Sequence, residues 1–300
     1  MGYIARKLGI SRQNRRVTGR NKDTMSRPTV RTRRLAAGLL LGGLAFCASV
    51  AASAQEPKAG PWRPLFDGKT LNGWTPKVAK HPAGENYRDT FVVDHGAIRV
   101  SYAGYDKLDG QFGHLFYKTP FKAYRLRLTY RFLTEGGLPD TPAWARSNSG
   151  IMFLSQSPES MTVDQPFPVS VEFQLLGKDG DAPRPTGAVC TPGITITIDG
   201  AKVKEHCTVP ANAPTIPNGT WVQAELDVLP NGEITQKING VAVHHYADAT
   251  LDPDDTVAGG AKPYILARGA QPVTEGYIAL QSEGHPIEFK DIQIQELTAR

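Results

Sequence analysis

Polar side chains that could do chemistry alternate with apolar ones in the segment 169–175. Ser170, Glu172 and Gln174 take turns with Val171 and Phe173. Because successive side chains of a β-strand point to opposite faces, the three polar groups share one face. A carboxylate between a hydroxyl and an amide can take a proton and can orient a polar ligand. A solvated outer face of a sheet would produce the same alternation, so this pattern alone leaves both interpretations open.

Two other segments offer matching polar groups. Asn148 and Ser149 precede Gly150, a residue that allows a ligand to approach the backbone closely. Arg127 and Arg131 fall on the polar side of an alternating strand over 124–133. If these strands neighbour the Glu172 strand, one sheet presents Arg, Glu, Gln, Asn and Ser on a concave surface.

The elements that must position these groups are all strands. Apolar runs or alternation bounded by Gly, Pro and Asn turns predict them at 91–94, 97–102, 113–118, 124–133, 169–175, 193–199, 221–229, 233–238, 241–246, 277–281 and 287–297. The apolar parity slips near residues 290–291, which predicts a bulge. No segment has a convincing amphipathic helical period, so we expect an all-β fold, a two-sheet antiparallel β-sandwich or jelly roll. The long segments 135–147 and 247–274 lack strand character and are expected to wall a site.

The N-terminus has the pattern of an export signal. Basic residues precede an apolar run over 35–50, and Ala52-Ser53-Ala54 forms an A-x-A site, so we expect cleavage after Ala54. The run is too short to span a bilayer comfortably, although a membrane anchor is the alternative. We therefore expect residues 1–54 to be extension and signal, 55–63 a lead-in and 64–300 one domain, secreted or periplasmic, with no membrane span in the mature form.

Removal of the leader reverses the charge of the chain. Residues 1–54 hold 11 of the 34 Lys and Arg and one of the 29 Asp and Glu, which leaves 23 basic against 28 acidic residues, a net charge of −5. A nucleic-acid partner is therefore not expected. The chain also lacks the G-x-S-x-G, H-E-x-x-H, P-loop and Rossmann signatures.

Two cysteines remain after the leader. Cys190 and Cys207 are an even pair in an exported protein, which favours a disulfide. Zinc ligation is the weaker alternative, because no partner ligands stand at the usual spacing.

Several motifs occur in an order that resembles one family. The stretch 64–74, Pro-Leu-Phe-Asp-Gly-Lys-Thr-Leu-Asn-Gly-Trp, resembles the opening of the 3-keto-disaccharide hydrolase domain family, also called DUF1080. Asn-Ser-Gly-Ile at 148–151, Glu-Phe-Gln-Leu-Leu at 172–176, Thr-Gly-Ala at 186–188 and Ile-Ala-Leu-Gln at 278–281 resemble later motifs in the right order. The resemblance covers about residues 62–297 and implies a concanavalin A-like jelly roll.

The resemblance also implies cleavage of glycosides already oxidised at C3. The C3 ketone acidifies the C2 hydrogen, so that one base and one electrophile suffice for elimination, after which water adds. On this view Glu172 is the candidate base and Arg131 the candidate clamp for the enolate. Asn148, Ser149, Gln174, Arg127, Thr186, Trp144, Gln281 and Glu283 are the candidate substrate-binding residues. A divalent metal is a possible cofactor, held through oxygen ligands.

Other functions fit the same fold. A non-catalytic carbohydrate-binding module would use exposed aromatic platforms such as Trp144. An ordinary glycosidase is disfavoured, because only one well-placed strand carboxylate is evident.

The chain also departs from the family at two places. It has Gly177 where an Asp is usual, and Glu283-Gly284-His285 where His-Gly often follows Leu-Gln-x.

Overall fold

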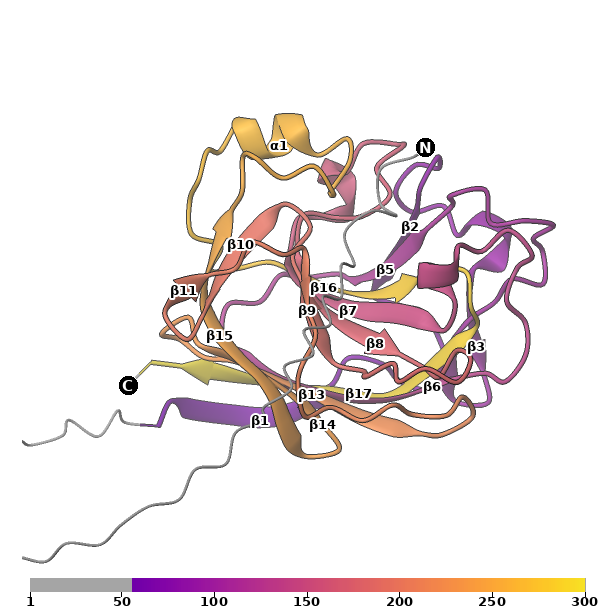
Figure 1. Ribbon diagram of the computed structural model, residues 1–300, viewed down its shortest axis with the longest axis horizontal. Coiled ribbons are helices and arrows are strands. Elements are labelled where there is room, and N and C mark those ends of the chain that lie inside the picture. Colours follow the sequence, from indigo (N-terminus) through magenta and orange to yellow (C-terminus); the bar gives the residue numbers. More distant parts are fainter. Residues whose placement is uncertain (1–55, 300) are drawn as a thin grey trace, which may run out of the picture. The chain divides into compact units, whose positions relative to one another are not determined.

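A computed structural model describes residues 56–299, which form two packed antiparallel sheets (Figure 1). The predicted leader and its cleavage site lie outside the described residues. The seven-stranded sheet has the order β12 (Cys207–Thr208), β9 (Ala188–Cys190), β8 (Val171–Leu176), β7 (Asn148–Ser155), β16 (Tyr277–Ser282), β5 (Gly113–Tyr117), β2 (Trp74–Val78).

The other sheet has ten strands. Its order is β11 (Ala201–Lys202), β10 (Ile194–Ile198), β15 (Val241–Leu251), β14 (Ile234–Ile238), β13 (Val222–Val228), β6 (Tyr124–Phe132), β17 (Ile287–Thr298), β4 (Ala97–Val100), β3 (Phe91–Asp94), with β1 (Lys58–Pro64) along β17. Helical structure in the described part is limited to α1 (Lys262–Leu266) and the short 3-10 turns η1 (Tyr87–Asp89), η2 (Ala143–Ala145) and η3 (Pro158–Ser160). The prediction of an all-β jelly-roll sandwich is confirmed.

The core lies between the sheets and follows from alternation. On β6, every second residue from Tyr124 to Phe132 is buried, and the residues between them, Arg127 and Arg131 included, are partly exposed. The facing side of the seven-stranded sheet supplies Ile151, Phe153 and other residues of β5, β7, β8 and β16. Apolar burial of this extent is the main stabilising contribution to such a fold.

The stretch 64–74 is a structural turn, as expected for the start of the domain. Both backbone amides that follow the Asp67 turn, those of Lys69 and Thr70, donate to Asp67 Oδ1 at 2.8 and 2.7 Å. The buried Trp74 ring donates from Nε1 to the carbonyl of Leu65 at 3.0 Å. These contacts close the turn and fix it on the core.

Three details refine the predicted strands. Residues 58–63, predicted as part of the lead-in, form β1 together with Pro64, because β17 offers them a free edge for pairing. The predicted bulge is confirmed by a register shift between Lys290 and Gln293 opposite β6. The segment 247–274 is less irregular than expected, since β15 continues to Leu251 and α1 follows.

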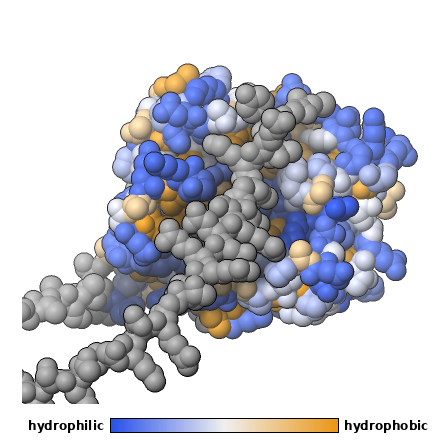
Figure 2. All heavy atoms as spheres, viewed as in Figure 1, coloured by the Kyte–Doolittle hydropathy of each residue, from blue (hydrophilic) through white to orange (hydrophobic). Residues whose placement is uncertain are grey.

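The visible surface of residues 56–299 is mostly polar (Figure 2), and their helices are short. Figure 2 shows hydrophilic residues over most of the visible surface, with apolar residues in small separate patches. In this part of the chain, no helix reaches the length and hydropathy needed to cross a bilayer.

Candidate active site

The seven-stranded sheet has a polar side that faces away from the core, here called the site face. It is defined by Lys77, His114, Asn148, Glu172, Gln174 and Gln281. Cross-strand partners point to the same side of a sheet. Lys77 therefore lies beside His114, His114 beside Gln281, and Gln174 beside Gly150.

Glu172 lies at the β8 end of the site face, which continues through β7, β16 and β5 to β2. It lies on β8 between Met152 of β7 and Cys190 of β9, and is 5% exposed. Its side chain leans across Gly150, where a Cβ would stand 2.4 Å from Glu172 Oε1. The glycine therefore makes the room that the carboxyl group occupies.

Burial changes the acidity of Glu172 strongly. Removal of the carboxylate from water raises the pKa of Glu172 from 4.5 to about 8. No hydrogen bond from the described residues to this carboxyl group offsets the cost of its burial. A buried carboxyl group with this acidity is suited to proton transfer near neutral pH.

Several polar atoms of the site face and of Glu283 are buried without a hydrogen-bond partner among residues 56–299. These include both ring nitrogens of His114, both amide atoms of Gln281, Asn148 Oδ1 and Glu283 Oε2. An unpaired buried polar group costs about 1–3 kcal/mol. Their concentration on one face indicates that they are arranged for a polar ligand.

His114 is a neutral member of the site face. Burial, together with the nearby positive charge of Lys77, lowers the pKa of His114 to about 3. A neutral imidazole offers one N–H donor and one acceptor nitrogen. Lys77 itself is anchored, because its Nζ donates to the carbonyls of Val78 and Val163, both at 3.0 Å.

Glu283 follows β16 and is 3% exposed. Burial and the negative charge of Glu172 raise the pKa of Glu283 well above its usual range, and the Arg184 guanidinium acts in the opposite direction. The two carboxyl groups therefore influence each other and belong to one site.

Aromatic rings line one side of this site. The Trp144 side chain is 46% exposed, and its ring lies 5.6 Å from that of Phe112. Phe112 in turn stacks on Phe167 at 5.2 Å, and Phe167 lies 6.2 Å from the His114 ring. Such a row offers apolar faces on which a sugar ring or an aromatic group can pack.

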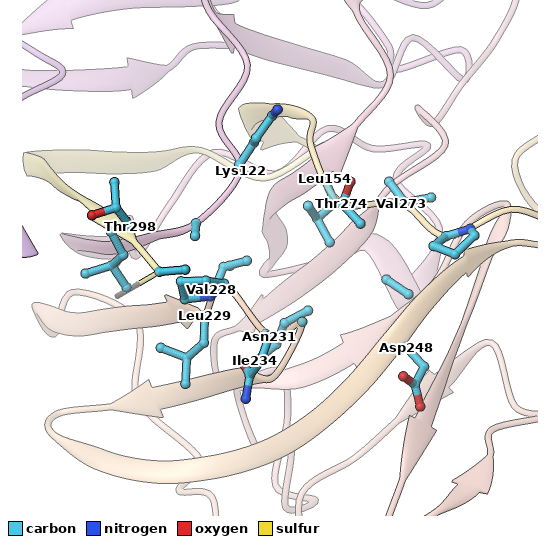
Figure 3. A pocket seen from close by; sticks show the side chains of 17 residues that line it. Lys122, Leu154, Val228, Leu229, Asn231, Ile234, Asp248, Val273, Thr274 and Thr298 are labelled. Carbon is cyan, nitrogen blue, oxygen red and sulfur yellow. The ribbon is translucent and has the colours of Figure 1, made fainter. Parts of the chain in front are cut away.

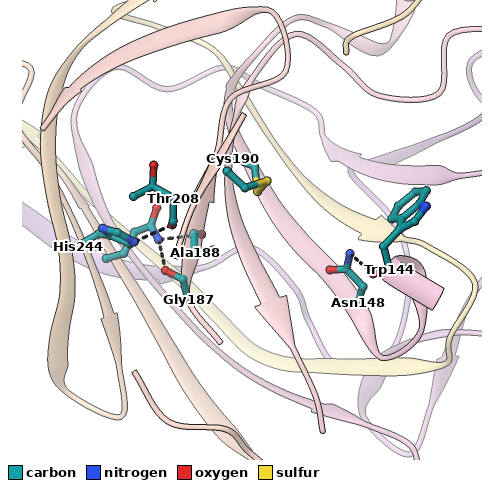
Figure 4. The surroundings of a disulfide bond; sticks show 9 residues. Trp144, Asn148, Gly187, Ala188, Cys190, Thr208 and His244 are labelled. Atoms are coloured by element: carbon teal, nitrogen blue, oxygen red, sulfur yellow. Dashed lines mark hydrogen bonds between the residues drawn. A yellow bond between two sulfur atoms is a disulfide. The ribbon is translucent and has the colours of Figure 1, made fainter. Parts of the chain in front are cut away.

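The Trp144 loop is held to the sheet by two polar side chains. Asn148 Nδ2 donates to the Trp144 carbonyl at 3.1 Å (Figure 4). Arg184 donates to the carbonyls of Trp144 at 3.0 Å and Ser147 at 2.9 Å. The loop 135–147 thus forms the wall that its lack of strand character predicted.

The structure brings some predicted site residues together and separates others. Asn148, Glu172, Gln174, Gln281 and Glu283 share the site, with Trp144 at its edge. Ser149 does not, because its side chain faces the opposite side of β7 and Oγ donates to the Gln281 carbonyl at 2.8 Å. Thr186 lies between the sheets, where its hydroxyl contacts Tyr130 Oη at 2.9 Å and accepts from the Leu176 amide at 3.0 Å. The predicted substrate contacts of Ser149 and Thr186 are therefore withdrawn.

The expected convergence of the arginines with Glu172 is wrong. Strand β6, which carries Arg127 and Arg131, lies in the ten-stranded sheet, and both side chains are on its outer side. Arg131 Nε donates to Glu288 at 2.7 Å, and its guanidinium lies over the Trp221 ring. Arg127 binds Gln293 and packs on Trp62. Both arginines bind residues of β17 and so join β6 to β17 on the outer side of the ten-stranded sheet, away from Glu172.

Residues that the sequence analysis did not select complete the site. His114 is hidden in the apolar run of β5, where only its pairing with Gln281 reveals its role. Arg184 lies in a Pro-rich loop without any motif. Neither residue carries a signal in the sequence that could have identified it.

The disulfide prediction is confirmed. Cys190 and Cys207 pair across β9 and β12 with an S–S distance of 2.07 Å (Figure 4). Because Cys190 is the cross-strand neighbour of Glu172, the disulfide borders the site face.

A metal site receives little support from the described residues. Among them, the group of potential ligands that lies close enough comprises Cys190, His206 and Cys207. Both cysteine sulfurs are bonded to each other, so these atoms are poor ligands. No three His, Cys, Asp or Glu side chains of the site face lie this close together in the described part of the chain.

A separate pocket of about 470 Å³ lies at the turn between β13 and β14 (Figure 3). Its wall is mainly apolar, and Lys122 and Asp248 are its charged residues. None of the site-face residues lines it, so it is distinct from the candidate active site.

The fold and site define a jelly-roll protein with a buried carboxyl- and amide-lined sheet face. The chain belongs to the 3-keto-alpha-glucoside-1,2-lyase-like domain family, whose model matches residues 61–295. The 3-keto-disaccharide hydrolase of Bacteroides thetaiotaomicron is 24% identical over 248 residues, 78% of this chain and 77% of that protein. Family and relative together indicate a carbohydrate-active function of the glycosyl-hydrolase kind.

Solved structures show more distant likenesses. A candidate glycosyl hydrolase from Parabacteroides distasonis has a TM-score of 0.47 at 17% identity, covering 79% of this chain and 94% of that one. A galectin-like protein from Bacillus subtilis has a TM-score of 0.43 at 12% identity, covering 82% and 99%. These likenesses are too distant to add to the argument on function.

Proposed function

We propose that this protein cleaves glycosides that carry a ketone at C3 of the sugar, by elimination followed by addition of water. Glu172 is the base that removes the C2 proton. The observation that carries the proposal is the buried Glu172 carboxyl group, on a sheet face where other buried polar atoms lack partners among the described residues. The family of the chain and the name of its Bacteroides relative support a 3-keto-glycoside as substrate.

The chemistry requires a hydrogen-bond donor for the C3 oxygen as well as a base. Loss of the C2 proton places negative charge on that oxygen, and donors preorganised in a buried site stabilise it. Gln281 Nε2 and the N–H of neutral His114 are unpaired and lie on adjacent strands. In this proposal Gln281 and His114, and not Arg131, bind the enolate oxygen.

The substrate is expected to lie against the aromatic side of the site. Gln174 and Asn148 offer amide groups for sugar hydroxyls, and Asn148 Oδ1 is an unpaired acceptor. The exposed Trp144 ring, supported by Phe112, offers an apolar surface to the sugar or to the leaving group. Export of the protein also belongs to the proposal, supported by the signal-like residues 31–54 and by the disulfide.

A pair of substrates tests the function. The purified protein is incubated with 4-nitrophenyl glucoside and with its 3-keto form, and released nitrophenol is measured. We expect release from the 3-keto form alone. Release from the unoxidised glucoside would indicate an ordinary glycosidase, and release from neither, with binding of both, would indicate a carbohydrate-binding module. Either result contradicts the proposal.

A further inference from the structure

Glu283 is a second buried carboxyl group that the proposed base mechanism leaves unused. Alternation along β16 places Ala279 and Gln281 on the site face, and Glu283 continues this series. Its Oε2 atom has no hydrogen-bond partner within residues 56–299. A carboxyl group in this setting is available for contact with a ligand.

The sheet register places the two carboxyl groups on opposite sides of β7. Leu280 pairs with Ile151, so the same register puts Gln281 beside Gly150 and Glu283 beside Asn148. Glu172 approaches from the other edge of β7 and leans across Gly150. The missing side chain of Gly150 lets the Glu172 carboxyl group reach across β7 toward the side on which Glu283 lies.

The electrostatics assign different protonation states to the pair. When two buried carboxyl groups interact, ionisation of one makes ionisation of the other less favourable. The pKa values therefore describe the pair rather than each residue alone. The pKa of Glu172 is about 8, and the charge of ionised Glu172 raises the pKa of Glu283 further. Glu283 therefore keeps its proton when Glu172 has lost its own, as an acid and a base in one reaction require.

We propose that Glu283 is the general acid that protonates the departing glycosidic oxygen in the elimination step. The inference rests on the proposed function of the site. Glu172 takes the C2 proton, and the C2–H electron pair gives the enolate of the C3 ketone; the enolate then collapses to form the C1–C2 double bond as the bond from C1 to the glycosidic oxygen breaks. That oxygen takes the Glu283 proton and leaves as an alcohol, so that Glu172 ends protonated and Glu283 ionised.

Addition of water restores both groups. Ionised Glu283 takes a proton from water as its oxygen bonds to C1, and protonated Glu172 returns a proton to C2. The net reaction consumes one water and needs no further reactant. Because each carboxyl group reverses its role between the two steps, both must be present for a full cycle.

The test measures how fast the variant Glu283→Gln cleaves two 3-keto-glucosides whose leaving groups differ in acidity. An alkyl 3-keto-glucoside has a leaving group that requires protonation, whereas 4-nitrophenol leaves well without it. In a single turnover with enzyme in excess, where only elimination is measured, we expect the variant to lose on the order of 10²-fold or more on the alkyl substrate and only a few-fold on the nitrophenyl substrate. Glu225→Gln, on the ten-stranded sheet, is the matched control and is expected to treat both substrates as the wild type does.

The outcomes separate this inference from the proposed function. If Glu283→Gln loses equally on both substrates, or loses on neither, Glu283 is not the general acid. If the wild type cleaves no 3-keto-glucoside, the proposed function itself fails. Glu283→Asp keeps a carboxyl group but withdraws it, and it should lose more on the alkyl substrate than on the nitrophenyl substrate. This second comparison keeps the test valid if Glu283→Gln folds poorly.

Discussion

The carboxyl group of Glu172 lies over the backbone of Gly150, in space that any other residue would fill. A Cβ on Gly150 would stand 2.4 Å from Glu172 Oε1, 2.7 Å from its Cγ and 2.9 Å from its Cδ. Because these atoms lie near the base of the Glu172 side chain as well as at its end, the side chain cannot avoid the contact by a small rotation. Gly150 is thus a positioning residue for the proposed base.

Gly150→Ala is therefore expected to displace Glu172 while leaving the strand in place. We predict a loss of about 10²-fold in the rate of 3-keto-glucoside cleavage, since small misplacements of a reacting group have effects of this size. The measurement is kcat/KM, accompanied by a thermal melt. Gly60→Ala is the control, because its new Cβ meets its nearest neighbour at an ordinary 3.4 Å. Unchanged activity in Gly150→Ala would show that the position of Glu172 is not critical.

Gln281→Met is expected to stabilise the fold and weaken the function. Both amide atoms of Gln281 are buried without a partner in the described structure, and Met has a similar shape without polar atoms. Removal of such groups should raise the free energy of unfolding by about 1–3 kcal/mol. Urea denaturation measures this gain, and a rise in KM or a fall in kcat measures the lost contact. A variant that is less stable, or fully active, would contradict the ligand-binding role of Gln281.

The rate and the stability should change with pH in opposite directions. The folded pKa of Glu172 is about 8, against an ordinary value of 4.5, so folding favours the protonated form. The stability that this form provides is complete below the unfolded pKa and is lost as pH rises through the folded pKa. The ionised base becomes more abundant over the same range, so activity should rise as stability falls.

Glu172→Gln separates these two effects. The variant should lose turnover, and its melting temperature should fall less between about pH 5 and about pH 9 than that of the wild type. Part of the slope should remain, because Glu283 titrates in the same direction. An unaltered dependence of the melting temperature on pH would show that Glu172 does not titrate in this range.

Removal of the disulfide should destabilise the domain. The bond joins residues 17 positions apart, and closure of a loop of this size contributes about 3 kcal/mol in the chain-entropy model. Cys190→Ala with Cys207→Ala should therefore unfold at lower denaturant concentration. A reducing agent should destabilise the wild type similarly and leave the double variant unaffected. Equal stability of all three forms would contradict a structural role for the bond.

The sequence correctly predicted on which face of its strand each polar side chain lies, but it did not predict which strands are neighbours in a sheet. Alternation placed Glu172 and Gln174 on one side of their strand and Arg127 and Arg131 on the outer side of theirs, as the structure has them. Strand order depends on contacts between distant segments, which no local pattern records. The arginines were therefore assigned to the wrong sheet.

Residues at the ends of strands were harder to interpret. Ser149 follows Asn148 in one motif, but successive side chains of a strand point to opposite faces, so the two residues do not share the site. Glu283 was noted because it departs from the family pattern, but only burial and its interaction with Glu172 show that it belongs to the site. His114 could not be found at all, because its neighbours are apolar and its partner Gln281 lies 167 positions further along the chain.

The central claim is that Glu172 removes the proton from C2 of a 3-keto-sugar. The most direct test is the release of nitrophenol from 4-nitrophenyl 3-keto-glucoside with hydrogen or deuterium at C2, measured as kcat/KM with the wild-type protein. Removal of that proton predicts clearly slower release from the deuterated substrate. Equal release from the two substrates would contradict the account.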